Sequence, residues 1–436
     1  MFIKGEIVLK FSYKNASNIL LVAFFFLQGT FAFRIVGPTI TIQRLFIVIL
    51  YLWTFSNLKI QKLFRNSTKR GRYTFTIAIY LFVCTYTAIL RLDFNTIFGV
   101  FVDCFLMYLL FLYFLDFKYS QEEVIQLITR IVLIACIFGL IEYVTHFNIF
   151  SFLTFATDVI PETMRDGVLR IRVTYGHPLA YGMFLVLFFP FCCYDYINNR
   201  IYLFQKPVTL GLVMVNILLT GSRSSIGIFC VELIIIAMLT SKAVKGNLVL
   251  GVIITVVIGG FIMITCLKSP LIQLLLRQIS YVIDEVFGTQ IAIHLGGDLS
   301  ISNSSIARDR LWKIFNYPDL NPLLGLGVST KKIFYISNWK VTSIDDFYVN
   351  QYIKFAYPGL IATIMMFIGY LWHCIYNYFK YHSKILLLCL IAGAGYMVNL
   401  IVVDELGTMK FFFFLMAFTR NTIQKSEEEK GKWLKK

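Results

Sequence analysis

Apolar runs long enough to cross a bilayer follow one another along most of this 436-residue chain. A hydrocarbon core about 30 Å thick needs roughly 20 apolar residues in a helix. The runs are continuous and lack period-two alternation, which excludes a membrane β-barrel. Charged residues make up 15% of the chain, well below the share of about 25% that is usual in a soluble domain. The sequence therefore predicts an all-α polytopic membrane protein.

Basic residues set the predicted orientation, because membrane proteins concentrate lysine and arginine in short cytoplasmic loops. The segment 59–72 is the most basic loop, and placing it inside puts both chain ends in the cytoplasm. The same rule accounts for much of the net charge of +16, which therefore does not indicate nucleic-acid binding. About twelve transmembrane helices result. They run roughly over 16–33, 42–55, 73–90, 96–115, 131–147, 179–197, 207–220, 224–240, 248–267, 358–379, 385–403 and 409–419.

Two longer polar segments fall outside the membrane in this arrangement. The first is 146–178, and the second is one large extracytoplasmic loop, 268–346, between spans nine and ten. Long loops do not follow the positive-inside rule, so their basic residues need another explanation. The whole chain, 1–436, is expected to form a single integral membrane domain.

The nine cysteines lie in or near the apolar spans, and neither long polar segment contains one. This placement gives no disulfide framework and no CxxC metal pattern. The adjacent Cys192 and Cys193 are interpreted as small apolar side chains. We expect neither a metal nor another cofactor.

The most patterned polar stretch, 308–330, lies in the large loop. Its first part is predicted to be a short helix that Ser304 or Ser305 caps and that Pro318 ends. A guanidinium beside an indole on such a helix suits an anionic, sugar-like or phosphate-bearing ligand. An ordinary amphipathic helix is the alternative. The residues predicted to share one side of this helix are Arg308, Leu311, Trp312 and Phe315.

Gly325 and Gly327 follow this helix. Because glycine has no Cβ, they allow a tight turn in which the backbone approaches a ligand. A plain surface turn is the alternative.

Arg170 and Arg172 alternate with apolar residues near the end of the first outside segment, as on an extended edge. Two interpretations stay open. The pair forms an anion-binding rim, or it consists of interfacial arginines that bind lipid headgroups. Gly176, His177 and Pro178 then lead into the sixth span.

Arg223 sits between two predicted spans so short that it must lie near the membrane surface. A charge so placed is expensive unless it is paired, which makes it a functional candidate. The backbone N–H groups that open the next helix add positive potential at the same place. A snorkelling arginine is the alternative.

Four carboxylates stand out in or beside the spans. Asp103 and Glu232 fall near the middle of theirs, where structural hydrogen bonds are favoured slightly over a proton relay. Asp345 and Asp346 precede the tenth span, and at least one of them is predicted to cap its helix. A carboxylate there is also a candidate general base at the outer membrane surface.

The order and topology of these motifs resemble the O-antigen polymerase and ligase superfamily, which includes Wzy-type polysaccharide polymerases. A span that ends near Arg223 is followed, one span later, by a large outside loop that holds Arg308 and Trp312. The similarity extends roughly over 170–369. Further along lie Asn321, Pro322, Gly325, Gly327, Asp346, Tyr348, Asn350 and Gly359.

This resemblance implies a metal-independent glycosyltransferase that uses no nucleotide sugar. The donor would be a glycan on undecaprenyl pyrophosphate, which a polymerase transfers to the non-reducing end of a new lipid-linked repeat unit. The resemblance further implies the bacterial cytoplasmic (inner) membrane, a site that faces the periplasm, and a protein partner that controls chain length. The product would be O-antigen, capsule or another exopolysaccharide.

Pyrophosphate is already a good leaving group, so such a site mainly needs cations that hold it and stabilise developing charge. Arg308 is assigned a catalytic role of this kind. Related ligases place a histidine before the Asn/Tyr segment, where this chain has Asp345 and Asp346. This departure weakens the ligase interpretation and makes Asp346 the expected general base. The residues expected to bind pyrophosphate or glycan are Arg170, Arg172, Arg223, Trp312, Gly325 and Gly327.

Two alternatives to the polymerase stay open. A ligase of the same superfamily would transfer the glycan to a lipid or another acceptor. A polysaccharide or small-molecule transporter with twelve spans would tend to show two similar halves and a long central cytoplasmic loop. Here the halves differ, the long loop is outside, and the unusual arginines gather at the outer surface.

Overall fold

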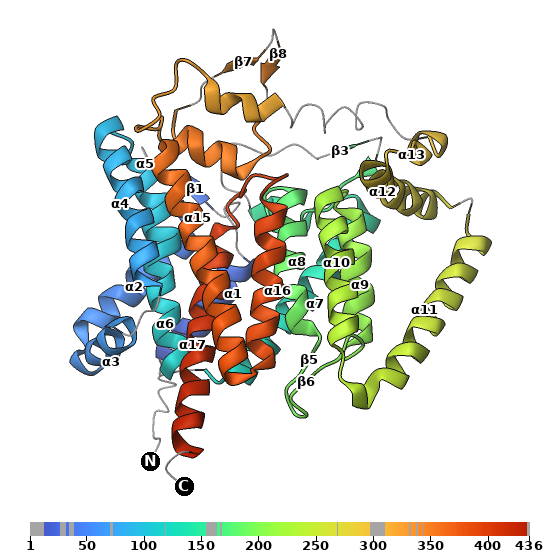
Figure 1. Ribbon diagram of the computed structural model, residues 1–436, viewed down its shortest axis with the longest axis horizontal. Coiled ribbons are helices and arrows are strands. Elements are labelled where there is room, and N and C mark those ends of the chain that lie inside the picture. Colours follow the sequence, from blue (N-terminus) through green and yellow to red (C-terminus); the bar gives the residue numbers. More distant parts are fainter. Residues whose placement is uncertain are drawn as a thin grey trace, which may run out of the picture.

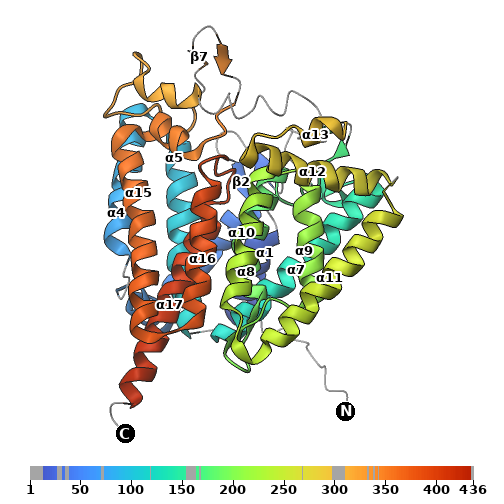
Figure 2. The same cartoon turned by 45° about the vertical axis from the view of Figure 1, so that its right-hand side comes forward.

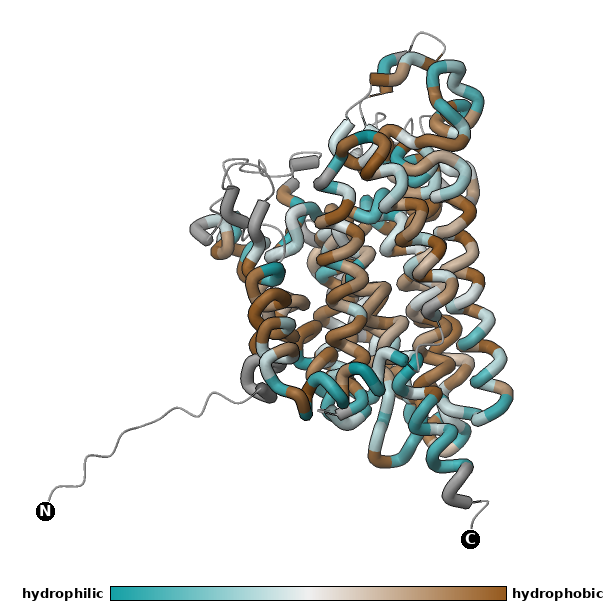
Figure 3. The backbone as a smooth tube through the Cα atoms, turned by 90° about the vertical axis from the view of Figure 1, so that its left-hand side faces the viewer, coloured by the Kyte–Doolittle hydropathy of each residue, from teal (hydrophilic) through white to brown (hydrophobic). Residues whose placement is uncertain are grey.

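Long apolar helices form most of the structure, as the sequence predicts (Figure 1). Figure 3 shows hydrophobic residues along the middle of the bundle and hydrophilic residues towards its ends. The all-α class is confirmed for the described residues, whereas the number of twelve spans stays a prediction. Among the described residues, four helices are long and apolar enough to cross a membrane: Asn95–Asp116, Gln121–Thr145, Lys242–Phe261 and Phe347–Tyr381.

The computed structural model describes residues 13–26, 32–34, 39–69, 73–117, 119–153, 164–165, 168–267, 269–296, 310–330, 333–336, 339–341 and 343–433. Its first elements are α1 (Tyr13–Phe26), β1 (Ala32–Arg34), β2 (Thr39–Thr41), α2 (Ile42–Ser56), α3 (Leu58–Lys69), α4 (Thr74–Arg91), α5 (Phe94–Ile97), the π-helix η1 (Phe98–Leu106), α6 (Met107–Phe117), α7 (Gln121–Thr145), the 3-10 helix η2 (Ile149–Leu153), β3 (Met164–Arg165), β4 (Val168–Leu169) and α8 (Pro178–Cys192).

The elements of the second part are β5 (Tyr194–Asp195), β6 (Arg200–Ile201), α9 (Pro207–Leu219), α10 (Arg223–Leu239), η3 (Lys242–Val244), α11 (Lys245–Thr265), α12 (Pro270–Phe287), α13 (Ile291–His294), η4 (Trp312–Asn316), β7 (Phe334–Ile336), β8 (Trp339–Val341), α15 (Phe347–Tyr381), α16 (Lys384–Asn399) and α17 (Met409–Trp433). The strands form small antiparallel pairs, β1 with β2, β3 with β4, β5 with β6 and β7 with β8.

The bundle has two distinct ends (Figure 1). We call the end that carries α12, α13, β7 and β8 the loop end, and the end that carries the β5–β6 hairpin and the last turns of α17 the tail end. Helices α8, α10 and α15 all begin at the loop end. Their N-termini therefore lie at the same end of the molecule.

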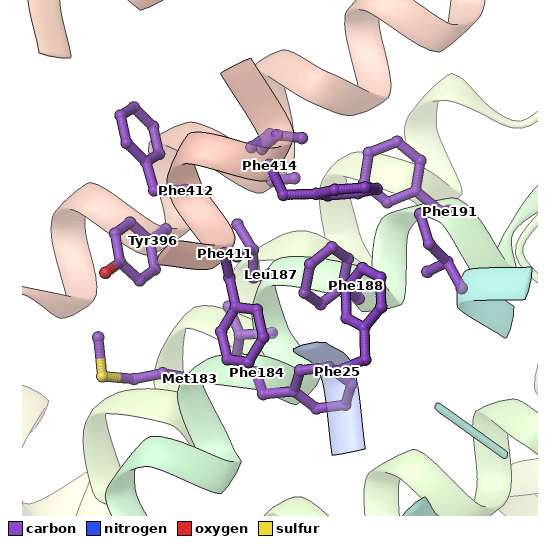
Figure 4. Packing of buried hydrophobic residues seen from close by; sticks show 14 of the residues in the cluster. Phe25, Met183, Phe184, Leu187, Phe188, Phe191, Tyr396, Phe411, Phe412 and Phe414 are labelled. Atoms are coloured by element: carbon purple, nitrogen blue, oxygen red, sulfur yellow. The ribbon is translucent and has the colours of Figure 1, made fainter. Parts of the chain in front are cut away.

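Aromatic rings from distant parts of the chain fill the centre of the bundle (Figure 4). The ring of Phe25 on α1 lies 5.3 Å from that of Phe188 on α8 and 5.0 Å from that of Phe414 on α17. Phe188 also lies 5.8 Å from Phe411, and these contacts are edge-to-face. Such pairs contribute about 0.5–1.5 kcal/mol each beyond the area they bury. The first and last helices thus share one core.

A buried ion pair joins helices at the tail end. Arg420 of α17 lies 2.7 Å from the carboxylate of Asp116 on α6 and donates to the Ser67 carbonyl oxygen at 3.0 Å. Removing either partner would leave an uncompensated buried charge, which is strongly destabilising. Asp116 and Arg420 both belong to segments predicted to face the cytoplasm, and the structure places them at one end.

Helix α15 is broken at Ala356, after its first section. Ala356 has φ 55 and ψ −164, and Pro358 carries no N–H, so backbone groups beside the break lose their helical partners. A segment of the large loop supplies one of them. The Tyr357 N–H donates to the Pro322 carbonyl oxygen at 3.1 Å.

The same loop segment satisfies the carbonyl groups that the break leaves open. Leu326 N donates to the Ile353 carbonyl oxygen at 2.9 Å, and Gly327 N donates to that of Lys354 at 3.0 Å. A Cβ at Gly325 would lie 2.1 Å from the Lys354 carbonyl oxygen, and Gly327 has φ +82. Gly325 thus permits a close backbone approach to α15, and Gly327 one to the Asp93 carboxylate, while the approach to a ligand stays a prediction.

Asp93, between α4 and α5, anchors the end of this segment. Its carboxylate accepts from Val328 N at 2.7 Å, from Ser329 N at 2.9 Å and from Ser329 Oγ at 2.6 Å. Desolvation raises the pKa of Asp93, but the hydrogen bonds from Ser329, Thr96 and Val328 outweigh it and lower the pKa below its usual value. The loop segment is thus held between α15 and the end of α4.

Part of the predicted large loop is regular structure. Helix α12 has 18 residues and lies across the loop end beside α9 and α10 (Figure 2). Leu274 and Tyr281 are buried, and Val282 approaches Gly227 of α10. Helix α11 stands at the edge of the bundle, with most of its apolar side chains exposed.

We expect Gly325→Ala to lower the midpoint of thermal unfolding in detergent by several degrees, because the added Cβ would overlap the Lys354 carbonyl group. Gly259→Ala in α11 is the matched control, since a Cβ there meets nothing within 4 Å. Differential scanning fluorimetry of the purified proteins measures both midpoints. Equal midpoints for Gly325→Ala and wild type would contradict the close packing described here.

Candidate functional site

The turn between α9 and α10 brings Arg170 towards Arg223. The Arg170 guanidinium donates from Nε to the Thr220 carbonyl oxygen at 2.7 Å and from Nη2 to that of Gly221 at 3.5 Å. Gly221 has φ +60, and an added Cβ would lie 3.0 Å from Arg170 Nε, so glycine suits this position. Arg223 follows as the first residue of α10 and is only 9% exposed.

The starts of α8 and α10 pack against each other beside Arg223. Ser222 caps α10, and its Oγ accepts from Ser225 N at 3.4 Å and donates to Ser225 Oγ at 2.8 Å. A Cβ at Gly182 on α8 would lie 2.7 Å from Ser225 Oγ. Helix N-termini carry positive potential, so two of them add to the charge of Arg223 here.

Glu142, near the loop end of α7, fixes the backbone around Arg172. Its Oε2 accepts from Arg172 N at 3.1 Å and from Val173 N at 2.7 Å. Asn148 Nδ2 bridges Glu142 Oε1 at 2.9 Å and the Val173 carbonyl oxygen at 2.7 Å. These bonds hold Val173 at φ 54, a left-handed conformation that strains a β-branched residue. Backbone strain of this kind clusters at functional sites.

His177 caps α8 and lies within electrostatic reach of both arginines of the segment. Its Nδ1 accepts from Leu179 N at 3.2 Å, with extended backbone angles of φ −141 and ψ 143. Burial, together with Arg170 and Arg172 and against the opposing effect of Asp345, lowers the pKa of His177 to about 4. The imidazole is therefore neutral at pH 7.

The end of α16 connects the start of α10 with the start of α15. Asn399 Nδ2 donates to Ser225 Oγ at 3.3 Å, and Phe347 N donates to the Leu400 carbonyl oxygen at 3.1 Å. Asp346, which is 1% exposed, caps α15 by accepting from the N–H three residues later at 3.0 Å. The predicted cap is confirmed. The neighbouring carboxylate of residue 345 is exposed.

We define the cationic cluster as Arg170, Arg172, His177 and Arg223. It combines three guanidinium groups, one neutral imidazole and the N-termini of α8 and α10 at the loop end. Guanidinium groups and helix N-termini bind phosphate and carboxylate oxygens. The arrangement can therefore hold an anion, with the Asp346 carboxylate on the adjoining start of α15.

Several predicted site residues are not part of this cluster. Arg308, together with the predicted caps Ser304 and Ser305, lies outside the described residues. Gly325 and Gly327 lie against the break in α15 and against the end of α4, as described above. The structure gives these two glycines a packing role.

Trp312 lies on the large loop and is 53% exposed, with its ring centroid 5.7 Å from that of Phe315. Leu311 and Ile314 are buried instead. Residues 312–316 form a 3-10 helix, whose three residues per turn place positions 311 and 314 on one side. The predicted grouping of Leu311 and Trp312 on one helix face is therefore wrong.

The two intramembrane carboxylates differ. Asp103, in η1, forms an ion pair with Arg44 at 2.6 Å, which confirms the structural role that the sequence analysis favours. Glu232 is 2% exposed, and neither of its oxygens has a hydrogen-bond partner among the described residues. The structural hydrogen bonds expected for Glu232 are thus not found there.

Sequence reasoning missed three residues that build the site: Glu142, His177 and Asn399. Each left a signal. A carboxylate or an amide within an apolar span indicates a polar partner, which applies to Glu142 and Asn399. His177 directly precedes Pro178, and proline is favoured at the first position of a helix, so the preceding residue is its cap.

A scan against protein-family models and a search of curated protein sequences found no match for this chain. The family resemblance therefore stays an expectation.

We expect His177 to make the protein less stable as the pH falls from about 6.5 to about 4. The unfolded histidine titrates near 6.5 and the folded one near 4, so between these values the unfolded chain binds more protons. This contribution is fully present above pH 6.5 and is lost as the pH falls through 4. His177→Asn keeps a cap acceptor but does not titrate, so its unfolding midpoint should decline less over this range. Parallel pH profiles for the two proteins would contradict the assignment.

Proposed function

We propose that this protein polymerises lipid-linked oligosaccharide repeat units. It would transfer the growing glycan from undecaprenyl pyrophosphate to the non-reducing end of a new lipid-linked repeat unit, for O-antigen or another surface polysaccharide. The observation that carries this proposal is the convergence of Arg170, Arg172 and Arg223 at one end of an apolar helical bundle. A lipid-linked pyrophosphate has both parts that such a place recognises, an anion and an apolar tail.

The chemistry asks for cations and one base. The cationic cluster would hold the pyrophosphate and stabilise the charge that develops as the sugar–phosphate bond breaks. Asp346 is the proposed base that accepts the proton of the acceptor hydroxyl. Asp346 lies at the start of α15. That start is connected to α10 through Asn399, which bonds Ser225, and Leu400, which bonds Phe347, and this supports a base next to the cluster. Arg308 and the exposed Trp312 would contact the donor and its glycan from the large loop.

We further propose that the loop end faces the periplasm of a bacterium and that the tail end faces the cytoplasm. The tail end carries the basic loops, which supports this orientation under the positive-inside rule. A partner protein that controls chain length belongs to the same proposal.

The first test is a glycan ladder on a gel. In a strain that lacks this protein, Arg170→Ala and Arg223→Ala are expected to restore the ladder at no more than about one per cent of wild-type activity, because removing one such donor typically costs about a hundredfold or more. Arg65→Ala, on the exposed face of α3 at the tail end, is the matched control and should restore the full ladder.

The phenotype of the null strain separates the candidate functions. A single repeat unit on the cell surface identifies a polymerase. Accumulation of full-length polymer on its lipid carrier would instead identify a ligase. If no repeat unit reaches the outer leaflet, the protein is a transporter and the proposal fails.

A second test separates capping from catalysis at Asp346. Asparagine caps helices about as well as aspartate, so Asp346→Asn is expected to keep the thermal midpoint near that of wild type. It cannot accept a proton in the same way, so polymerisation should fall about a hundredfold or more. Asp345→Asn is the control variant. A ladder of normal intensity from Asp346→Asn would rule out this residue as the base.

A further inference from the structure

The hydrogen bond of His177 with the backbone fixes which of its nitrogens carries the proton. An amide N–H only donates, so Nδ1, which lies 3.2 Å from Leu179 N, is the unprotonated nitrogen. In a neutral imidazole the proton is then on Nε2. No hydrogen bond within the described part of the chain involves Nε2. His177 thus has a fixed donor on the side of its ring away from the cap.

We propose that His177 is a pyrophosphate-binding residue whose Nε2–H donates a hydrogen bond to an oxygen of the lipid-linked pyrophosphate. This inference rests on the proposed function and deepens it. It adds a neutral donor to a site that the sequence analysis builds from arginines. The ligand oxygen would lie between this donor and the guanidinium groups of Arg170 and Arg172. These two arginines and Asp345 are the charged groups that shift the pKa of His177.

Neither a general base nor a plain cap explains this histidine as well. Its unprotonated nitrogen already accepts the Leu179 N–H, so it is not available to take a proton from a substrate. Serine, threonine, aspartate and asparagine are the preferred caps, and their short side chains have no donor at the position of the histidine Nε2. Imidazole combines a cap acceptor with a donor that points elsewhere.

The neutral state of His177 lets its Nε2–H act as a donor while Nδ1 caps α8. Burial and the adjacent Arg170 and Arg172 lower the pKa of His177 to about 4, so the ring gains no proton at neutral pH. A proton on Nδ1 would remove the acceptor of the Leu179 N–H and add a fourth positive charge to the cationic cluster. The neutral ring keeps the cap and the donor together.

Asparagine and glutamine separate the two nitrogens of His177. His177→Asn keeps an acceptor for the Leu179 N–H but has no donor at the position of Nε2. His177→Gln places an amide donor near that position but loses the cap. We expect purified His177→Asn in detergent to bind undecaprenyl pyrophosphate about ten- to a hundredfold more weakly than wild type, as for a lost hydrogen bond to a charged group. His177→Gln should lose less affinity although its thermal midpoint falls.

Undecaprenol and phosphatidylglycerol are the control ligands, because one lacks the pyrophosphate and the other carries an ordinary lipid phosphate. Both variants should bind undecaprenol as wild type does. If wild type prefers undecaprenyl pyrophosphate and His177→Asn binds it equally tightly, the role of His177 is overturned and the proposed function stands. If wild type binds all three lipids equally, the proposed function fails and this inference falls with it.

Discussion

Backbone polar groups without partners are the constraint on which the structure depends, because an apolar environment offers no water to satisfy them. Two departures from a regular helix at the loop end are matched by partners from elsewhere in the chain. The break at Ala356 receives the loop segment 322–327, and the strained backbone at Val173 receives the Glu142 carboxylate. At these two places irregular backbone coincides with polar groups from distant parts of the chain, and the cationic cluster lies at one of them.

The features that follow from local sequence were predicted well. Continuous apolar runs specify helices because each helix satisfies its own backbone. At least one of Asp345 and Asp346 is predicted to cap the helix from its position before an apolar run, and Asp346 does. Arg170, Arg172 and Arg223 stood out because a guanidinium near an apolar span needs a reason to be there. The helices and the cap depend on physics within a few residues, whereas Arg170 donates to the Thr220 carbonyl oxygen 50 residues away.

The features that follow from contacts distant in sequence were not predicted. The contact of Gly325 with the break in α15, about 30 residues further on, is not indicated by any local pattern. The face of the helix near Trp312 was misjudged because 3-10 and α periodicity differ by little over one turn. The bonds of Glu142 to Arg172 and Val173 span 30 and 31 residues, and no local pattern indicates them.

The caps of α8, α10 and α15 give the starts of these three helices different electrostatic potentials. Asp346 carries a negative charge, so it offsets the positive potential at the start of α15. Ser222 and the neutral His177 leave the potential at the starts of α10 and α8 in place, and Arg170 and Arg223 add to it. An anion should therefore bind at α8 and α10, while the carboxylate stays beside it at α15. The proposed transferase would use this separation, because its leaving group must be held by cations while its base remains free of them.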